Sequence, residues 1–127
     1  MNIIDSQGNM KTPKVHFDPE QGLIELSGRS IPENTDSLYR PLIEWVEEYI
    51  NNPQPVTTVN IKFEYFNSSS AKYLIRLLEY IHRIEATENK LIFNWYYEDE
   101  ELLEYGQDFQ EVLEMKFNFI KSADYKN

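Results

Sequence analysis

Apolar and polar residues alternate in several short stretches of the chain, as they do in half-buried β-strands. Two such stretches lie at residues 14–18 and 23–28, and the Pro-Glu-Gln-Gly segment at 19–22 between them has the residue types of a tight turn. This pair predicts an opening β-hairpin. The clearest alternation covers residues 56–66, and an apolar, aromatic run at 90–97 is typical of a strand in the centre of a sheet.

Three longer stretches carry apolar residues at the spacing of an amphipathic helix. The first follows Asn34 or Asp36, either of which is a suitable N-cap, and its Pro41 predicts that the regular helix begins near that residue or bends there. The second opens after residues 67–70, and the third opens at the acidic run 98–101. The three apolar faces consist of Leu38, Leu42, Trp45, Val46, Tyr49 and Ile50; of Leu74, Leu77, Leu78 and Ile81; and of Leu102, Leu103, Tyr105, Phe109 and Val112.

With a short edge strand at residues 117–120, the predicted order is β-β-α-β-α-β-α-β. Strands that alternate with helices imply a mixed β-sheet packed with crossover helices, an α/β sandwich. This order resembles the STAS fold of bacterial anti-sigma-factor antagonists. We expect a single domain over residues 13–121, a flexible N-terminus over residues 1–12 and a flexible tail over residues 122–127.

Composition narrows the classes of function. The chain has 127 residues, no cysteine and a formal net charge of −10, so a disulfide, a zinc–thiolate cluster and a cysteine nucleophile are excluded. An acidic surface without a basic patch repels nucleic acid and anionic lipid. No signal-peptide pattern or bilayer-length apolar stretch occurs, which predicts a cytoplasmic protein with no membrane insertion.

Residues suited to catalysis are sparse. His16 and His82 stand apart with no metal-ligand spacing, and four glycines leave no Gly-rich phosphate loop. The acidic run 98–101 lacks the alternating spacing of a calcium loop and suits the start of a helix instead. We therefore predict that the protein is not an enzyme and uses no metal or cofactor.

Residues 67–70, Asn-Ser-Ser-Ser, join the 56–66 strand to the second helix. Asn and Ser are preferred N-cap residues, so these side chains can simply cap the helix. The same geometry suits a phosphate, because the first turn leaves backbone N–H groups unpaired and the helix dipole favours negative charge. Lys72 and Arg76, one and two turns beyond Ser68, are placed to reach a phosphate on that serine. The residues alone leave both interpretations open.

Family resemblance adds to this picture. Residues 32–34 (Pro-Glu-Asn) are followed by 45–47 (Trp-Val-Glu), then 65–72 (Tyr-Phe-Asn-Ser-Ser-Ser-Ala-Lys) and 94–97 (Asn-Trp-Tyr-Tyr). These stretches, in this order and spacing, resemble the SiaC family of regulatory phosphoproteins, which have a STAS-like fold. The similarity covers nearly the whole chain, from about residue 12 to residue 119.

The resemblance implies that Ser68, directly after Asn67, is the phosphoacceptor, and that Ser69 is the next candidate. Asn67 would then shape and cap the phosphate loop together with Ser69 and Ser70, and Lys72 would steady the phosphate. The implied partners are a cognate GHKL-type serine/threonine kinase, a PP2C-type phosphatase and a diguanylate cyclase (a GGDEF protein). The unphosphorylated form would bind and stimulate the cyclase and so raise cyclic di-GMP.

From the sequence we therefore interpret the chain as a regulatory phosphoprotein that acts as a partner switch. The alternative is a constitutive protein- or ligand-binding STAS-like domain in which the serines only cap a helix. A second rival is an enzyme that uses the acidic run 98–101 and a metal ion.

Overall fold

Six strands form one mixed sheet in the order β1-β2-β3-β4-β5-β6 in the computed structural model, which describes residues 1–122. The strands are β1 (Ile4–Ser6), β2 (Lys14–Asp18), β3 (Leu23–Ser30), β4 (Val56–Phe66), β5 (Lys90–Tyr97) and β6 (Asn118–Lys121). The helices are α1 (Thr35–Tyr49), α2 (Ser68–His82), a short 3-10 helix η1 (Arg83–Ala86) and α3 (Glu100–Leu113). Most of the expected C-terminal tail, residues 123–127, lies outside the described residues.

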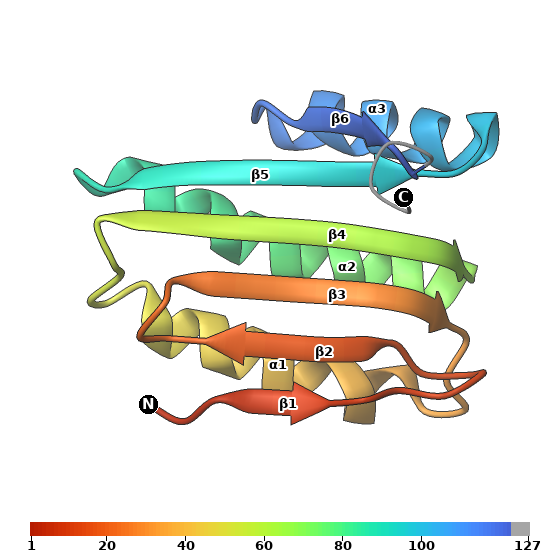
Figure 1. The fold of residues 1–127 in the computed structure, drawn as a ribbon, viewed down its shortest axis with the longest axis horizontal. Helices are drawn as coiled ribbons and strands as arrows, with labels where there is room; N and C mark the ends of the chain where they lie inside the picture. Colours follow the sequence, from red (N-terminus) through yellow and green to blue (C-terminus); the bar gives the residue numbers. More distant parts are fainter. Residues whose placement is uncertain (123–127) are drawn as a thin grey trace.

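All three long helices cover the same face of the sheet (Figure 1). β1, β2 and β3 pair antiparallel, whereas β3, β4, β5 and β6 pair parallel. Each parallel connection needs a crossover, and α1, α2 and α3 supply the three crossovers. Because the strands advance across the sheet in one direction and crossovers share one handedness, the helices fall on one side. The predicted mixed α/β architecture is confirmed.

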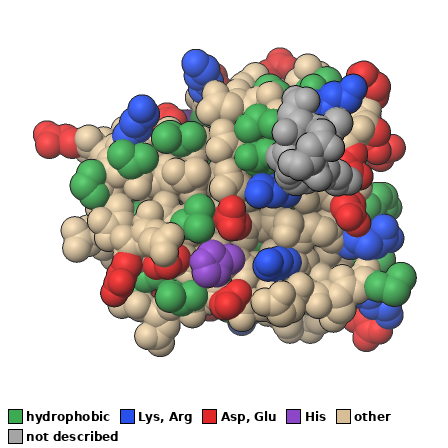
Figure 2. Space-filling view, in the orientation of Figure 1, with side chains coloured by type: hydrophobic (Ala, Val, Ile, Leu, Met, Phe, Trp, Pro, Cys, Tyr) green, Lys and Arg blue, Asp and Glu red, His purple; other side chains and the backbone are tan. Residues whose placement is uncertain are grey.

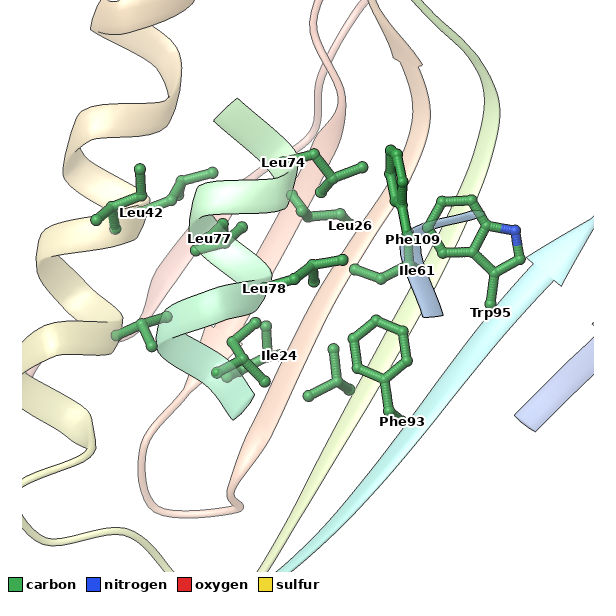
Figure 3. Packing of buried hydrophobic residues seen from close by; sticks show 14 of the residues in the cluster. Ile24, Leu26, Leu42, Ile61, Leu74, Leu77, Leu78, Phe93, Trp95 and Phe109 are labelled. Atoms are coloured by element: carbon green, nitrogen blue, oxygen red, sulfur yellow. The ribbon is translucent and has the colours of Figure 1, made fainter. Parts of the chain in front are cut away.

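The core fills the space between the helices and the sheet (Figure 3). Leu74, Leu77 and Leu78 of α2 are fully buried and point toward the inner faces of the central strands. One row of inward residues crosses the sheet in register: Val15, Leu26, Ile61 and Trp95. The apolar face that helical periodicity predicts for the second helix is therefore buried in the core, as expected.

Two local features differ from the sequence-based expectation. Strand β1 was not predicted, because three residues are too few to show a period of two. Ile4 packs against the core, and Trp45 Nε1 donates a hydrogen bond of 2.8 Å to the carbonyl of Asn2.

Helix α1 starts at Thr35, well before Pro41, and continues through that proline. Because Pro41 has no backbone N–H, the carbonyl of Ser37, four residues earlier, lacks its helical hydrogen bond. Ser37 is exposed, so water can take the place of that donor.

The outer face of the sheet carries a ladder of polar residues. One position on every strand contributes to it, in the registered order Asp5, His16, Glu25, Asn60, Asn94 and Asn118. Asn118 Nδ2 donates to Asn94, Asn94 Nδ2 to Asn60, and Asn60 Nδ2 to Glu25, over 3.2, 2.9 and 2.8 Å. Figure 2 shows acidic, basic and histidine side chains interspersed on this face rather than gathered by sign.

Candidate functional site

Three helices begin at one edge of the sheet. The carboxyl ends of β3, β4 and β5 lie at this edge, and α1, α2 and α3 start just beyond them (Figure 1). Each helix has a side-chain cap on a backbone N–H: Asn34 accepts from Ser37, Asn67 from Ser70, and Asp99 from Leu102. Ligands of parallel α/β sheets commonly bind at the carboxyl ends of the strands, so this edge is the first place to look for a site.

The first turns of these helices differ in charge. Asp36 lies in the first turn of α1, and Glu100 and Glu101 lie in that of α3. The first turn of α2 contains no acidic residue. A carboxylate in the first turn offsets the positive end of the helix dipole, and of these three helices α2 alone has no acidic residue of its own in that turn. This is the turn that contains the three consecutive serines.

Ser70 is closed to modification by its burial. Its exposed fraction is 0%, and its Oγ donates a 2.9 Å hydrogen bond to the carbonyl of Ser30. The hydroxyl of Ser30 lies 2.9 Å from Ser70 Oγ and 2.7 Å from the phenol oxygen of Tyr39. Burial raises the pKa of the Tyr39 phenol, and the hydrogen bonds from the two serines oppose that rise. These hydroxyls tie α1, the end of β3 and the start of α2 together.

Ser69 and Ser68 are both exposed but are bonded differently. Ser69 Oγ lies 2.9 Å from Thr35 Oγ1 on α1 and donates to Asn67 Oδ1 over 3.4 Å. Ser68 is the first residue of α2, and its hydroxyl makes no hydrogen bond to any other residue in the range 1–122. Of the three serines, Ser68 is therefore the one whose hydroxyl is exposed and makes no hydrogen bond within residues 1–122.

Basic groups follow the serines along α2. Lys72, one turn beyond Ser68, is exposed, and so is Arg76, one turn further on. The Arg76 guanidinium lies over the ring of Tyr73 at 5.3 Å from its centroid. Tyr73 donates a 3.0 Å hydrogen bond to Asp36 Oδ1, and this bond raises the pKa of the phenol. The structure thus places Lys72 as the cation closest along the helix to Ser68.

The side chains around Ser68 do not include a general base arranged to activate it. Asp36 accepts from Tyr73 and pairs with Arg40, and both histidines lie elsewhere, in β2 and at the end of α2. Within residues 1–122 no three His, Asp or Glu side chains are grouped to hold a metal ion, and no helix is long and apolar enough to cross a membrane.

The predicted site residues lie close together in the structure. Asn67 caps α2, as proposed, and the serines occupy its first turn. Sequence reasoning did not find Thr35 of α1, which bonds Ser69, or Ser30 of β3, which bonds both Ser70 and Tyr39. Thr35 and Ser30 lie 34 and 40 residues from their partners in the serine run and carry no motif of their own. Only the packing of α1 beside α2 could reveal them.

The fold is that of a STAS-like α/β domain, and the exposed Ser68 lies at the start of its helix α2. The chain matches the model of "SiaC family regulatory phosphoprotein" over residues 6–122, and it belongs to that family. The family resemblance noted in the sequence is thereby confirmed. The proteins of this family are described as regulatory.

Solved structures of Pseudomonas aeruginosa proteins are similar to it. SiaC of P. aeruginosa is 25% identical, with 94% of this chain and 97% of that chain covered and a TM-score of 0.81. SiaC in the crystal structure of the diguanylate cyclase SiaD in complex with its activator SiaC has a TM-score of 0.85 at 24% identity, with 93% and 98% covered, which shows the shared fold. An uncharacterized protein of strain UCBPP-PA14 is 25% identical over 119 residues, covering 92% of this chain and 94% of its own.

Proposed function

We propose that this chain is a partner switch: its unphosphorylated form binds and activates a diguanylate cyclase, and phosphorylation of Ser68 releases that partner. The observation that carries the proposal is the exposed, unbonded Ser68 hydroxyl on a helix start without acidic residues. Support comes from the family, described as regulatory phosphoproteins, and from a SiaC of the same fold that is described as the activator of a cyclase.

Each residue of the junction has a distinct part in the proposed switch. Ser68 accepts the phosphate, while Asn67 caps the helix and holds the turn. Lys72 steadies the phosphate, and Ser69 is the alternative acceptor because it is also exposed. Ser70 holds the turn to β3 from inside the protein. Modification at Ser68 would therefore change the surface without disturbing the core.

The phosphate would act on the partner through charge. It adds roughly −1.5 to −2 charges at an exposed position, where backbone N–H groups and the helix dipole stabilise it. In a desolvated contact without a matching cation, such a charge costs several kcal/mol, which corresponds to a loss of affinity of roughly 100-fold or more. A cognate GHKL-type kinase adds the phosphate, and a PP2C-type phosphatase removes it. Because the kinase needs ATP, we place the switch in the cytoplasm.

The test combines phosphorylation, binding and stability. After treatment with the cognate kinase, intact mass should rise by one phosphate in the wild type and in Ser69→Ala, but not in Ser68→Ala. Ser68→Ala should still bind and activate the cyclase, whereas the phosphorylated wild type should bind roughly 100-fold more weakly. Thermal melts should show Ser68→Ala close to the wild type and Ser70→Ala less stable by about 1–2 kcal/mol, since the latter loses a buried hydrogen bond.

Two results would contradict the proposal. Full phosphorylation of Ser68→Ala would show that another residue is the acceptor, and Ser69 would be the next candidate. Equal cyclase affinity of the modified and unmodified protein would refute the switch and favour a constitutive binding domain whose serines only shape the helix start.

A further inference from the structure

A small pocket of about 110 Å³ opens on the face of the sheet that the helices leave uncovered. It is lined by Lys14 and His16 of β2, Glu25 and Ser27 of β3, and Lys62 of β4. Two neighbouring rows of the sheet supply these side chains: Lys14, Ser27 and Lys62 are registered in one row, and His16 and Glu25 belong to the polar ladder beside it. Regular strands therefore hold every wall of the pocket.

The first of these rows carries hydrogen-bond donors. Lys14 is exposed and forms no ion pair with another residue between 1 and 122, and the Ser27 hydroxyl makes no hydrogen bond within that range. Lys62 stands on the far side of Ser27 from Lys14, with about 4.8 Å between neighbouring strands. The Lys62 ammonium also lies 4.9 Å from the centroid of the Tyr96 ring. Two ammonium groups thus flank a hydroxyl that has no partner in the described chain.

Two carboxylates of the adjoining ladder row are engaged by their neighbours. Glu25 Oε2 accepts a 2.8 Å hydrogen bond from Asn60 Nδ2 and lies 3.9 Å from Lys62 Nζ. Asp5 Oδ1 lies 3.5 Å from His16 Nδ1. These contacts satisfy the carboxylate oxygens and fix the side of the pocket that they form. Figure 2 shows basic and acidic side chains around a histidine on this face.

We propose that this pocket binds a small oxyanion, with a phosphate group as the preferred ligand. Lys14 and Lys62 contact its oxygens from two sides, and the Ser27 hydroxyl donates to it from the floor of the pocket. Hydrogen bonds from ammonium groups to a phosphate are charge-assisted and therefore stronger than bonds between neutral groups. The ligand is free orthophosphate or the phosphate end of a small phosphomonoester, because a pocket of about 110 Å³ holds little more than one such group.

Other ligand classes fit the pocket less well. A metal cation would face two ammonium groups, which repel it. A nucleic acid needs a basic surface that follows its backbone, whereas this site is a single pocket on a chain with a net charge of −10. The proposal is independent of the partner switch, since α2 and its Ser68 belong to the layer on the other side of the sheet.

The test is an NMR titration of the isolated, unphosphorylated protein. Orthophosphate, and in a second series glycerol 3-phosphate, replaces chloride at constant ionic strength. The resonances of Lys14, His16 and Ser27 should shift and saturate, with a dissociation constant on the order of 1–10 mM for the better ligand. Tighter binding of the ester would identify a phosphomonoester as the ligand, and equal or tighter binding of orthophosphate would identify the free ion.

Variants connect the shifts to the pocket. Lys14→Gln and Ser27→Ala should each weaken binding by roughly three- to tenfold, because each removes one donor to the anion. Lys116→Gln removes an exposed lysine from the segment between α3 and β6, and it is the matched control that should bind as the wild type does. Melting curves of the three variants check that the fold is intact.

Three results would overturn the proposal. Shifts that rise linearly without saturation would show no site. Saturable shifts confined to residues 67–70 would assign the anion to the start of α2 instead. Unchanged dissociation constants in both Lys14→Gln and Ser27→Ala would exclude the pocket as the place of binding. Each of these results leaves the Ser68 switch standing, because the titration involves neither kinase nor cyclase.

Discussion

At the residue scale, three serines of identical chemistry occupy three different environments. Ser70 is buried and bonded to β3, Ser69 is exposed and bonded to Thr35, and Ser68 is exposed with a hydroxyl that bonds no other residue between 1 and 122. The helical rotation of 100° per residue separates them, because adjacent residues of a helix point in different directions. Burial therefore sets Ser70 apart from the other two serines, and the hydrogen bond to Thr35 sets Ser69 apart from Ser68.

The buried hydroxyl network behind the serines predicts a dependence of stability on alkaline pH. The raised pKa of Tyr39 means that the folded protein retains this proton at a pH where the unfolded chain, with a phenol pKa of about 10, releases it. Stability from this group is complete below pH 10 and is lost as pH rises toward the folded pKa. The advantage of wild type over Tyr39→Phe in free energy of unfolding should therefore shrink from pH 9 to pH 11.

Urea denaturation at several pH values measures this difference. Tyr105→Phe, on the outer side of α3, is the matched control for removing a phenol hydroxyl. A difference between wild type and Tyr39→Phe that stays constant across the range would contradict the prediction.

At the element scale, the polar ladder on the open face has one residue on each of the six strands, and hydrogen bonds join its members from β3 to β6. The carboxylate of Glu25 can only accept hydrogen bonds, so it orients the amide of Asn60 with its nitrogen toward β3. Asn60 in turn orients Asn94, and Asn94 orients Asn118. A shift of one residue in any of the strands β3 to β6 would break this chain of bonds and turn the side chains of that strand to the other face, so the ladder favours a single register.

Asn60→Asp tests the ladder. The change keeps an acceptor for Asn94 but replaces the donor to Glu25 with a second carboxylate, so two negative charges would face each other across β3 and β4. We expect a loss of about 1–3 kcal/mol in free energy of unfolding near neutral pH. The loss should diminish toward pH 4, where carboxylates begin to accept protons.

Chemical denaturation at pH 7 and pH 4 makes the comparison. Asn118→Asp is the matched control, because Asn118 stands at the exposed end of the ladder and faces no carboxylate. Equal, pH-independent losses in both variants would show that charge at the centre of the ladder is unimportant.

At the scale of the whole molecule, charge is distributed unevenly. The exposed side of α3 is acidic, through Glu100, Glu101, Glu104, Asp108 and Glu111. The open sheet face mixes charges of both signs (Figure 2), and α2 exposes Lys72 and Arg76. Arg76 lines a pocket together with Glu44 and Glu47 of α1. A molecule with this surface is suited to protein partners.

We expect no binding of nucleic acid. Association with DNA or RNA requires a basic surface that releases counterions from the phosphates, and the net charge of −10 opposes it. Short DNA and RNA duplexes should migrate unchanged with the protein at about 0.15 M salt in a gel-shift assay. A complex that weakens as salt increases would contradict this expectation.

The sequence by itself determined the elements and the layers of this protein. Period-two alternation marked β2, β3 and β4, and the leucine stripe marked α2, because core-facing residues must recur at the period of the element that carries them. It also located the serine turn, since Asn67 and the serines have the chemistry of a helix start. For the N-cap of α1 the sequence predicts Asn34 or Asp36, and the structure has Asn34 in that position.

Only the tertiary structure decided the features that depend on contacts between distant segments. Strand β1 exists because β2 offers it a partner and the core accepts Ile4. Helix α1 continues through Pro41 because its apolar face packs against the sheet, which outweighs the lost backbone bond. The different environments of the three serines and the hydroxyl network of Ser30 and Tyr39 arise where elements meet. Local sequence carries no signal for such contacts, because the side chains involved are remote along the chain and become neighbours only on folding.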